Sequence, residues 1–198
     1  MYSQQHLCQT SGMRHCGKFI LVVALYLACS ATHAWSSTFR PLTLSKLVHQ
    51  STSVVVATPV SFSSHWAAMG ARSRVVTDIT LEVAWTLRGH DSTGKDIVVR
   101  TLGGTVGGIA QLVHGEAQLR VGQTCLLFLV PGRDGVLHVL GMAQGHYPLA
   151  ADGHGDWRVT PSPQLDGIAN PELSAPQILS GRRLTEVSDL LKAQESAP

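Results

Sequence analysis

The stretch Ser73–Leu102, SRVVTDITLEVAWTLRGHDSTGKDIVVRTL, decides the fold class. Its first half alternates with a period of two. One predicted face holds Val75, Thr77, Ile79, Leu81, Val83, Trp85 and Leu87, and the other holds Val76, Asp78, Thr80, Glu82, Ala84, Thr86 and Arg88. A helix of the same residues would leave no polar face. The period of two and the many β-branched residues therefore predict a long strand with one face in a core and the other in water, as in an antiparallel sheet or barrel wall.

The rest of the chain is predicted to be mostly strands and tight turns. After a turn at residues 89–95, the predicted strands are Asp96–Leu102, Thr124–Val130, Val136–Leu140 and Trp157–Thr160, and an earlier strand covers Ser53–Ser61. Pro59 predicts an edge position or a bulge near the end of that earlier strand. Apolar spacing predicts a short N-terminal helix at Leu42–His49 and an amphipathic C-terminal helix at Leu184–Ala193. The segments Phe62–Arg72 and Gly103–Glu116 are predicted to be loops, the second because it holds five glycines.

The N-terminus has the pattern of a secretory signal peptide. The apolar run Phe19–Ala28 follows Arg14 and Lys18 and is too short to span a bilayer. Thr32 and Ala34 suit the −3 and −1 positions of a cut before Trp35. We therefore predict a signal peptide at 1–34, a β-barrel domain at 35–160, and an irregular wrap with the C-terminal helix at 161–198. The mature chain would be exported, secreted or periplasmic, without a transmembrane span.

Translation from Met13 and cleavage after Ala28 are alternatives at this end of the chain. The second would leave Cys29 as the first residue. Tyr26-Leu27-Ala28-Cys29 resembles a bacterial lipoprotein box, although Tyr26 stands where that box has a small aliphatic residue. This resemblance implies a lipid anchor at Cys29 as the alternative to a soluble exported protein.

Removing the signal segment changes the charge and the cysteine count. The full sequence has 15 basic and 13 acidic residues, and the signal segment contains two of the basic residues and no acidic one. The chain without this segment therefore has 13 basic and 13 acidic residues and a formal charge of zero. This balance argues against a nucleic-acid partner and against a polybasic contact with a membrane surface. Cys125 is the one cysteine left after this cut, so no internal disulfide forms, and its apolar surroundings predict a buried, inert thiol.

The order of the elements resembles the netrin-like, TIMP-like pattern. The phrases that carry the resemblance are SVVVATPVS, ITLEVAWTLRG, IVVRTLGG and VGQTCLLFLV, within Ser53–Leu140. The phrases TLGGTVGGI and GMAQG also resemble exported bacterial proteins without an assigned function. The resemblance implies a small five-to-seven-stranded antiparallel barrel of the OB kind. Family members that inhibit metalloproteases use an N-terminal cysteine and several disulfides. Here Cys29 alone could take that role, and it has no evident partner cysteine.

The searched catalytic motifs are absent from the sequence. It has no G-x-S-x-G, H-E-x-x-H, C-x-x-C or Walker motif, so we assign no catalytic, cofactor-binding or metal-binding residue. His138, His146 and His154 fall on neighbouring predicted hairpins, with Asp152 and Asp156 beside the last. They are either candidates for a zinc site or scattered surface histidines. Asp78 and Glu82 are expected to be solvated on the wet strand face.

The predicted function is a non-enzymatic binding module for an unknown protein or small ligand. Its expected contact surface is the two predicted loops, which carry Trp66, Met69, Ile109 and Leu112. A metalloprotease inhibitor, and a hydrolase with a metal or Ser/His site assembled from loops, are the alternatives. Nucleic-acid binding by an OB barrel is excluded, because Trp85 is the only aromatic residue on the relevant strands and is expected on the apolar face.

Overall fold

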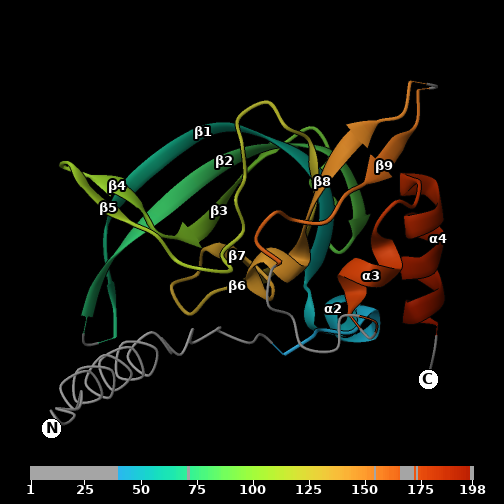
Figure 1. The fold of residues 1–198 in the computed structure, drawn as a ribbon, viewed down its shortest axis with the longest axis horizontal. Helices are drawn as coiled ribbons and strands as arrows, with labels where there is room; N and C mark the ends of the chain where they lie inside the picture. The colour runs from blue at the N-terminus through green and yellow to red at the C-terminus, as the bar shows by residue number, and fades with distance from the viewer. Residues whose placement is uncertain (1–39, 71, 154, 166–171, 173, 197–198) are drawn as a thin grey trace, which may run out of the picture. The chain divides into compact units, whose positions relative to one another are not determined.

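The computed structural model describes residues 40–70, 72–153, 155–165, 172 and 174–196. The described chain is mostly β, with helices α2 (Leu44–Gln50), α3 (Ala175–Leu179) and α4 (Leu184–Glu195) and a short 3-10 helix η1 (Met142–Gly145) (Figure 1). The two predicted helices are confirmed, and α3 was not predicted. No helix in these ranges is long and apolar enough to cross a membrane. The predicted signal segment and Cys29 lie outside the described residues.

Seven strands form one sheet in the order β1-β2-β3-β7-β6-β8-β9. They are β1 (Ser53–Met69), β2 (Arg72–Arg88), β3 (Asp96–Leu102), β6 (Cys125–Pro131), β7 (Leu137–Val139), β8 (His146–Ala151) and β9 (Trp157–Val159). β1 also pairs with β6, so β1, β2, β3, β7 and β6 form a partial ring. β3 and β7 are parallel, which makes the sheet mixed and corrects the prediction that it is antiparallel throughout.

The predicted loop Phe62–Arg72 is wrong, because these residues mostly continue two long paired strands. β1 and β2 each run for 17 residues and pair without a break from Ser61 opposite Thr80 to Met69 opposite Arg72. No proline or glycine interrupts β1 between Val60 and Met69, so its outer half stays extended. The register shifts between Pro59 and Ser61, which confirms the irregularity predicted from Pro59.

A second register shift corrects the predicted position of Trp85. Val56 lies opposite Trp85 and Ala57 opposite Val83, so Ala84 has no partner on β1. An extra residue of this kind is a β-bulge, and it reverses which face the following side chains occupy. Ile79, Leu81 and Val83 are buried as predicted, but Trp85 is 46% exposed on the other side of the strand.

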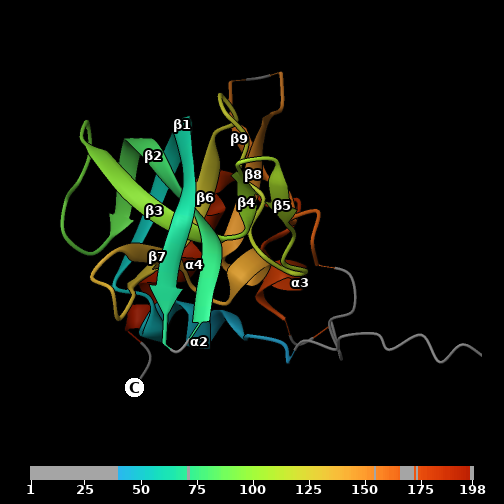
Figure 2. The same cartoon turned by 90° about the vertical axis from the view of Figure 1, so that its left-hand side faces the viewer.

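The sheet separates two apolar cores. Inside the partial ring, Val55 and Ala57 of β1 meet Ile79, Leu81 and Val83 of β2 and Leu127 and Leu129 of β6. On the other side, Val54 and Val56 pack with Phe128, Tyr147 and the buried faces of the three helices. Figures 1 and 2 show these helices grouped together beside the sheet. Because β1 contributes to both cores, its first residues are a continuous apolar run rather than an alternating one.

The predicted loop Gly103–Glu116 contains a short hairpin. β4 (Gly104–Val106) pairs with β5 (Ile109–Gln111) as a separate two-stranded sheet. A Cβ on Gly104 would lie 2.3 Å from Thr77 Oγ1 and 2.5 Å from Ser64 Oγ, so the hairpin passes closely over the β1–β2 pair. Only glycine allows this approach at a φ of +134°.

Candidate functional site

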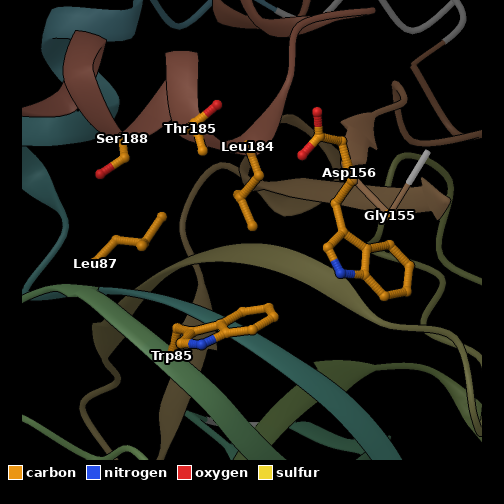
Figure 3. Close-up of a pocket in the computed structure, with 8 residues that line it drawn as sticks. Trp85, Leu87, Gly155, Asp156, Leu184, Thr185 and Ser188 are labelled. Atoms are coloured by element: carbon orange, nitrogen blue, oxygen red, sulfur yellow. The ribbon is translucent and has the colours of Figure 1, made fainter. Parts of the chain in front are cut away.

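A cleft lies between the end of β2, the β8–β9 hairpin and α4 (Figure 3). Its volume is about 510 Å³, and we call it the tryptophan cleft. It is lined by Trp85, Leu87, Gly155, Asp156, Trp157, Leu184, Thr185 and Ser188. Apolar clefts of a few hundred Å³ with a small number of polar groups are typical sites for small ligands.

Three elements place these side chains. The bulge at Ala84 turns Trp85 out of the ring interior and toward the cleft. Trp157 is the first residue of β9 and pairs with Ala151 across the hairpin. Leu184 and Ser188 lie one helical turn apart on α4 and therefore point the same way. In Figure 3, Trp85 lies across the cleft from this part of α4.

The cleft combines flat apolar surface with polar groups that are free to bind. Within the described ranges, the indole N–H groups of Trp85 and Trp157 and the hydroxyls of Thr185 and Ser188 make no hydrogen bond. The carboxylate of Asp156 lies 3.6 Å from Arg183 Nη1, and both side chains are about half exposed. An ion pair that exposed contributes little stability, so a ligand can displace it at low cost.

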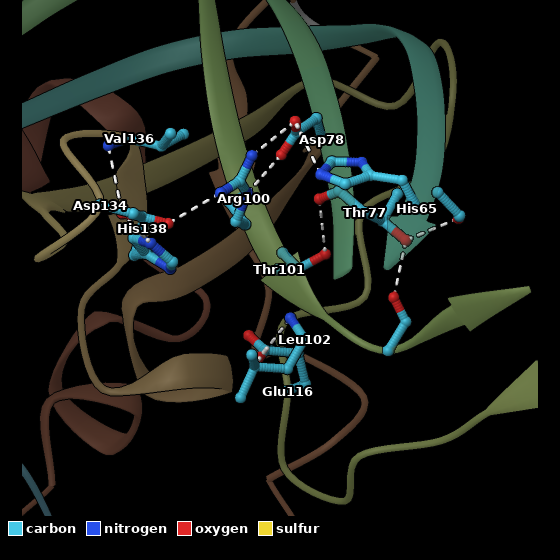
Figure 4. Close-up of polar contacts among 12 residues, drawn as sticks. His65, Thr77, Asp78, Arg100, Thr101, Leu102, Glu116, Asp134, Val136 and His138 are labelled. Atoms are coloured by element: carbon cyan, nitrogen blue, oxygen red, sulfur yellow. Dashed lines mark hydrogen bonds and ion pairs between the residues drawn. The ribbon is translucent and has the colours of Figure 1, made fainter. Parts of the chain in front are cut away.

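A polar network crosses the opposite part of the sheet (Figure 4). Arg100 of β3 donates from Nε to Asp78 Oδ1 at 2.6 Å and from Nη2 to Asp78 Oδ2 at 2.8 Å, which is a bidentate pair. Its Nη1 donates to Asp134 Oδ2 at 2.8 Å, and the other oxygen of Asp134 lies 3.2 Å from His138 Nε2. His65 Nε2 is 3.9 Å from Asp78. The expectation that Asp78 is simply solvated is therefore wrong.

The electrostatics of the network follow from these contacts. The hydrogen bonds from Arg100 lower the pKa of Asp78, and the same bonds raise the pKa of the guanidinium. Burial acts to raise the pKa of Asp134, but hydrogen bonds from His138, the Val136 N–H and Arg100 outweigh it and lower the pKa. β3 and β7 share only two paired positions, so this network adds side-chain contacts where the ring has little backbone pairing.

The two described histidines among those considered for zinc have different partners. His138 belongs to the polar network, His146 is buried against Ser162, and His154 lies outside the described residues. Across the part of the chain that the structure covers, no group of three His, Cys, Asp or Glu side chains is arranged to hold a metal ion.

A Ser/His pair among the described residues, Ser162 and His146, has catalytic spacing but is inaccessible. His146 Nδ1 lies 3.0 Å from Ser162 Oγ, yet their exposed fractions are 1% and 3%. Burial lowers the pKa of His146 to about 4, so the imidazole is neutral at physiological pH. In this enclosed pair, the serine and the neutral histidine satisfy each other's hydrogen-bonding groups. A substrate cannot reach either side chain.

Two further buried ionisable groups have structural contacts. Cys125 is buried as predicted, and desolvation raises the pKa of its thiol to about 12, which makes it a poor nucleophile. Glu116 accepts hydrogen bonds from the backbone N–H groups of Leu102 at 3.2 Å and Ala117 at 3.1 Å. Burial nevertheless raises the pKa of Glu116. Its carboxylate thus accepts a hydrogen bond from the last residue of β3.

The side chains predicted to form a contact surface are exposed. Trp66, Met69, Ile109 and Leu112 all lie open to solvent, on the β1–β2 hairpin and on or next to β5. They do not line the tryptophan cleft. The cleft itself was not predicted, because Trp85 was assigned to the core and Trp157 to an ordinary strand.

Comparison of the chain with models of known protein families found no match, and comparison with curated protein sequences likewise found none.

Proposed function

We propose that this protein is an exported binding module that holds a saccharide ring in the tryptophan cleft. The observation that carries the proposal is Trp85, a large aromatic side chain left 46% exposed beside a second tryptophan in a cleft of about 510 Å³. Large apolar groups in a concave, partly open position are typical of a surface that a ligand covers.

The chemistry of the cleft favours a ring that is apolar on its faces and hydroxylated at its edge. The C–H face of a pyranose stacks on an indole, which offers a broad, rigid apolar surface. Its hydroxyl groups can then bond with the unoccupied hydroxyls of Thr185 and Ser188 and with the carboxylate of Asp156. A purely apolar ligand would leave these polar groups without partners, which is costly once water is excluded.

We further propose that the partial ring is a small, partly open barrel of the OB, netrin-like kind. Two observations support this. The pairings from β1 through β2, β3, β7 and β6 return to β1, and the inward side chains of these strands share one apolar cluster. OB barrels are five-stranded and bind ligands with loops and exposed strand faces, which agrees with a non-enzymatic role.

Export is supported by the signal-peptide pattern of residues 1–34. Intact mass and N-terminal sequencing of the protein recovered from an exporting host test it. A chain that begins at Trp35 supports a soluble secreted or periplasmic protein. A chain that begins at Cys29 with a diacylglycerol adduct replaces it with a lipoprotein, and an uncleaved chain overturns export.

The ligand proposal is tested by calorimetric titration of the purified protein with a panel of soluble oligosaccharides, together with pull-down on insoluble polysaccharides. We expect saturable binding of at least one saccharide and a loss of about tenfold or more in affinity for Trp85→Ala and Trp157→Ala, equal to about 1.4 kcal/mol. Trp66→Ala is the matched control, because Trp66 is similarly exposed, at 49%, but lies outside the cleft.

Two results would overturn the ligand proposal. One is the absence of binding across the whole saccharide panel by a folded protein. The other is an equal loss of affinity for Trp66→Ala and Trp85→Ala, which would place the ligand elsewhere on the surface.

A further inference from the structure

A second hollow lies between the tip of the β1–β2 hairpin and the turn that joins β6 to β7. Its volume is about 690 Å³, and we call it the tip groove. It is lined by Ala68, Met69, Gly70, Gly132, Arg133, Asp134 and His138. None of these residues lines the tryptophan cleft, so the two sites are separate.

Two further arginines lie on the hairpin beside this groove, although they do not line it. Arg72 lies opposite Met69 and Arg74 opposite Ala67, in an unbroken antiparallel register. Side chains two residues apart on a strand share a face, so Arg72 and Arg74 point to the same side of β2 as Asp78. Asp78 joins through Arg100 to Asp134, which lines the groove.

Three of the arginines in or beside the groove have guanidinium groups without a partner among the described residues. Arg72, Arg74 and Arg133 are exposed, and their guanidinium groups form no hydrogen bond or ion pair with any residue that the structure describes. By contrast, the guanidinium of Arg100 is fully engaged by two carboxylates. The positive charge of the other three is therefore available to a ligand.

The local charge balance is positive. Four arginines (Arg72, Arg74, Arg100 and Arg133) and two aspartates (Asp78 and Asp134) lie in the groove, on the hairpin beside it or in the adjoining polar network, which gives a formal charge of +2 for this region. The chain outside the predicted signal segment is neutral as a whole, so this is a concentration of charge rather than a general property. Both aspartates already accept hydrogen bonds from Arg100, which reduces their competition for the free arginines.

We propose that the tip groove binds a small organic anion that carries a carboxylate or phosphate group. Arg133 holds the anionic group from the β6–β7 turn, and Arg72 or Arg74 holds it from the hairpin. A guanidinium matches both groups, because its N–H donors form a planar fork that pairs with two oxygens at once. Met69 and Ala68 offer an apolar wall for the uncharged part of the ligand.

The test is isothermal titration at low ionic strength with two probes, inorganic phosphate and succinate, against the same buffer with added chloride. We expect saturable binding of one or both probes and a loss of about tenfold or more for Arg133→Gln and for Arg72→Gln combined with Arg74→Gln. A preference for phosphate or for succinate identifies which anionic group the groove selects. Arg120→Gln is the control, because Arg120 is exposed and its guanidinium forms no hydrogen bond or ion pair with a described residue, but it lies neither in the groove nor on the β1–β2 hairpin beside it.

Equal affinity of the Arg133→Gln and Arg120→Gln proteins would overturn the proposal, as would the absence of saturable binding of either probe. Displacement by chloride at equal concentration would also overturn it, because a built site discriminates among anions. These variants replace side chains without partners and are expected to fold. Trp85→Ala should leave anion binding unchanged, so failure of the saccharide proposal and failure of this one are distinguishable.

Discussion

The buried side chain of His146 makes the fold sensitive to acid. It is 1% exposed, and its Nδ1 lies 3.0 Å from Ser162 Oγ. Burial lowers its pKa from an ordinary 6.5 to about 4. The folded protein therefore keeps this imidazole neutral over a pH range in which the unfolded chain accepts a proton.

The sign and size of the effect follow from that difference. Because the unfolded state binds the extra proton, the free energy of unfolding falls as the pH drops from about 6.5 to about 4 and is constant, for this group, outside that window. Each pH unit within the window costs at most about 1.4 kcal/mol, so the whole shift is worth on the order of 3 kcal/mol. This is a large fraction of the stability of a typical domain, which is about 5–15 kcal/mol.

Urea unfolding of the wild-type protein and of His146→Gln, followed in steps from about pH 7 to about pH 4.5, measures this contribution. The wild type should lose stability steadily, and the variant should lose about 2–3 kcal/mol less over the same range. Glu116 has a raised pKa and acts in the opposite direction, because protonation favours its folded state, but it does so in both proteins. Parallel curves for the two proteins would refute the reasoning.

Four further substitutions test the packing. Tyr147→Phe should raise the free energy of unfolding by about 1 kcal/mol, because the buried Tyr147 hydroxyl has no partner among the described residues; a lower stability in thermal unfolding would contradict this. Trp85→Ala should cost less than about 1 kcal/mol in urea unfolding, whereas Leu81→Ala in the ring core should cost about 2–5 kcal/mol, and similar costs would contradict the bulge. Gly89→Ala should destabilise by more than about 1 kcal/mol, because φ is +93° and the new Cβ would meet the Thr52 carbonyl at 2.5 Å; an unchanged midpoint would contradict that clash.

The elements that the sequence predicts well are those set by local pattern. Alternation along Val75–Val83 depends only on neighbouring residues and a buried inner face. The predicted inner positions Val75, Thr77, Ile79, Leu81 and Val83 are buried as expected, but Val76, predicted to face water, is buried as well. The apolar spacing of Leu184, Val187 and Leu191 likewise predicts a helix that packs on the sheet through one apolar face. Val187 and Leu191 are buried in the core between the sheet and the three helices. Such local patterns can be recognised without knowledge of the tertiary structure, because any strand or helix that packs on a core needs one apolar face.

The errors occur where distant segments decide the structure. Residues 62–69 are polar, small and aromatic, with no alternation to mark a strand, and they extend because β2 pairs with them one by one. The parallel pairing of β3 with β7 depends on how the strands of the ring come together in the tertiary structure. It cannot be predicted from a local sequence pattern. The hydrogen bonds from Arg100 to Asp78 and Asp134 join residues that are 22 and 34 positions apart in the sequence. The sequence therefore could not show that Asp78, on the solvent-facing side of β2, is paired rather than solvated.

A single unpaired residue, Ala84, links the fold to the candidate site. Strict alternation would turn Trp85 into the ring interior, which is already filled by Val55, Ala57, Leu81, Val83 and their neighbours. Forcing an indole into such a core costs roughly 1–3 kcal/mol in displaced side chains and backbone. The bulge avoids this overpacking but leaves a large apolar ring in water, where only a ligand or another surface can cover it. The same inserted residue therefore explains why the ring core ends at Val83 and why the tryptophan cleft begins at Trp85. Unfolding of Trp85→Ala measures the first consequence, and its saccharide affinity measures the second.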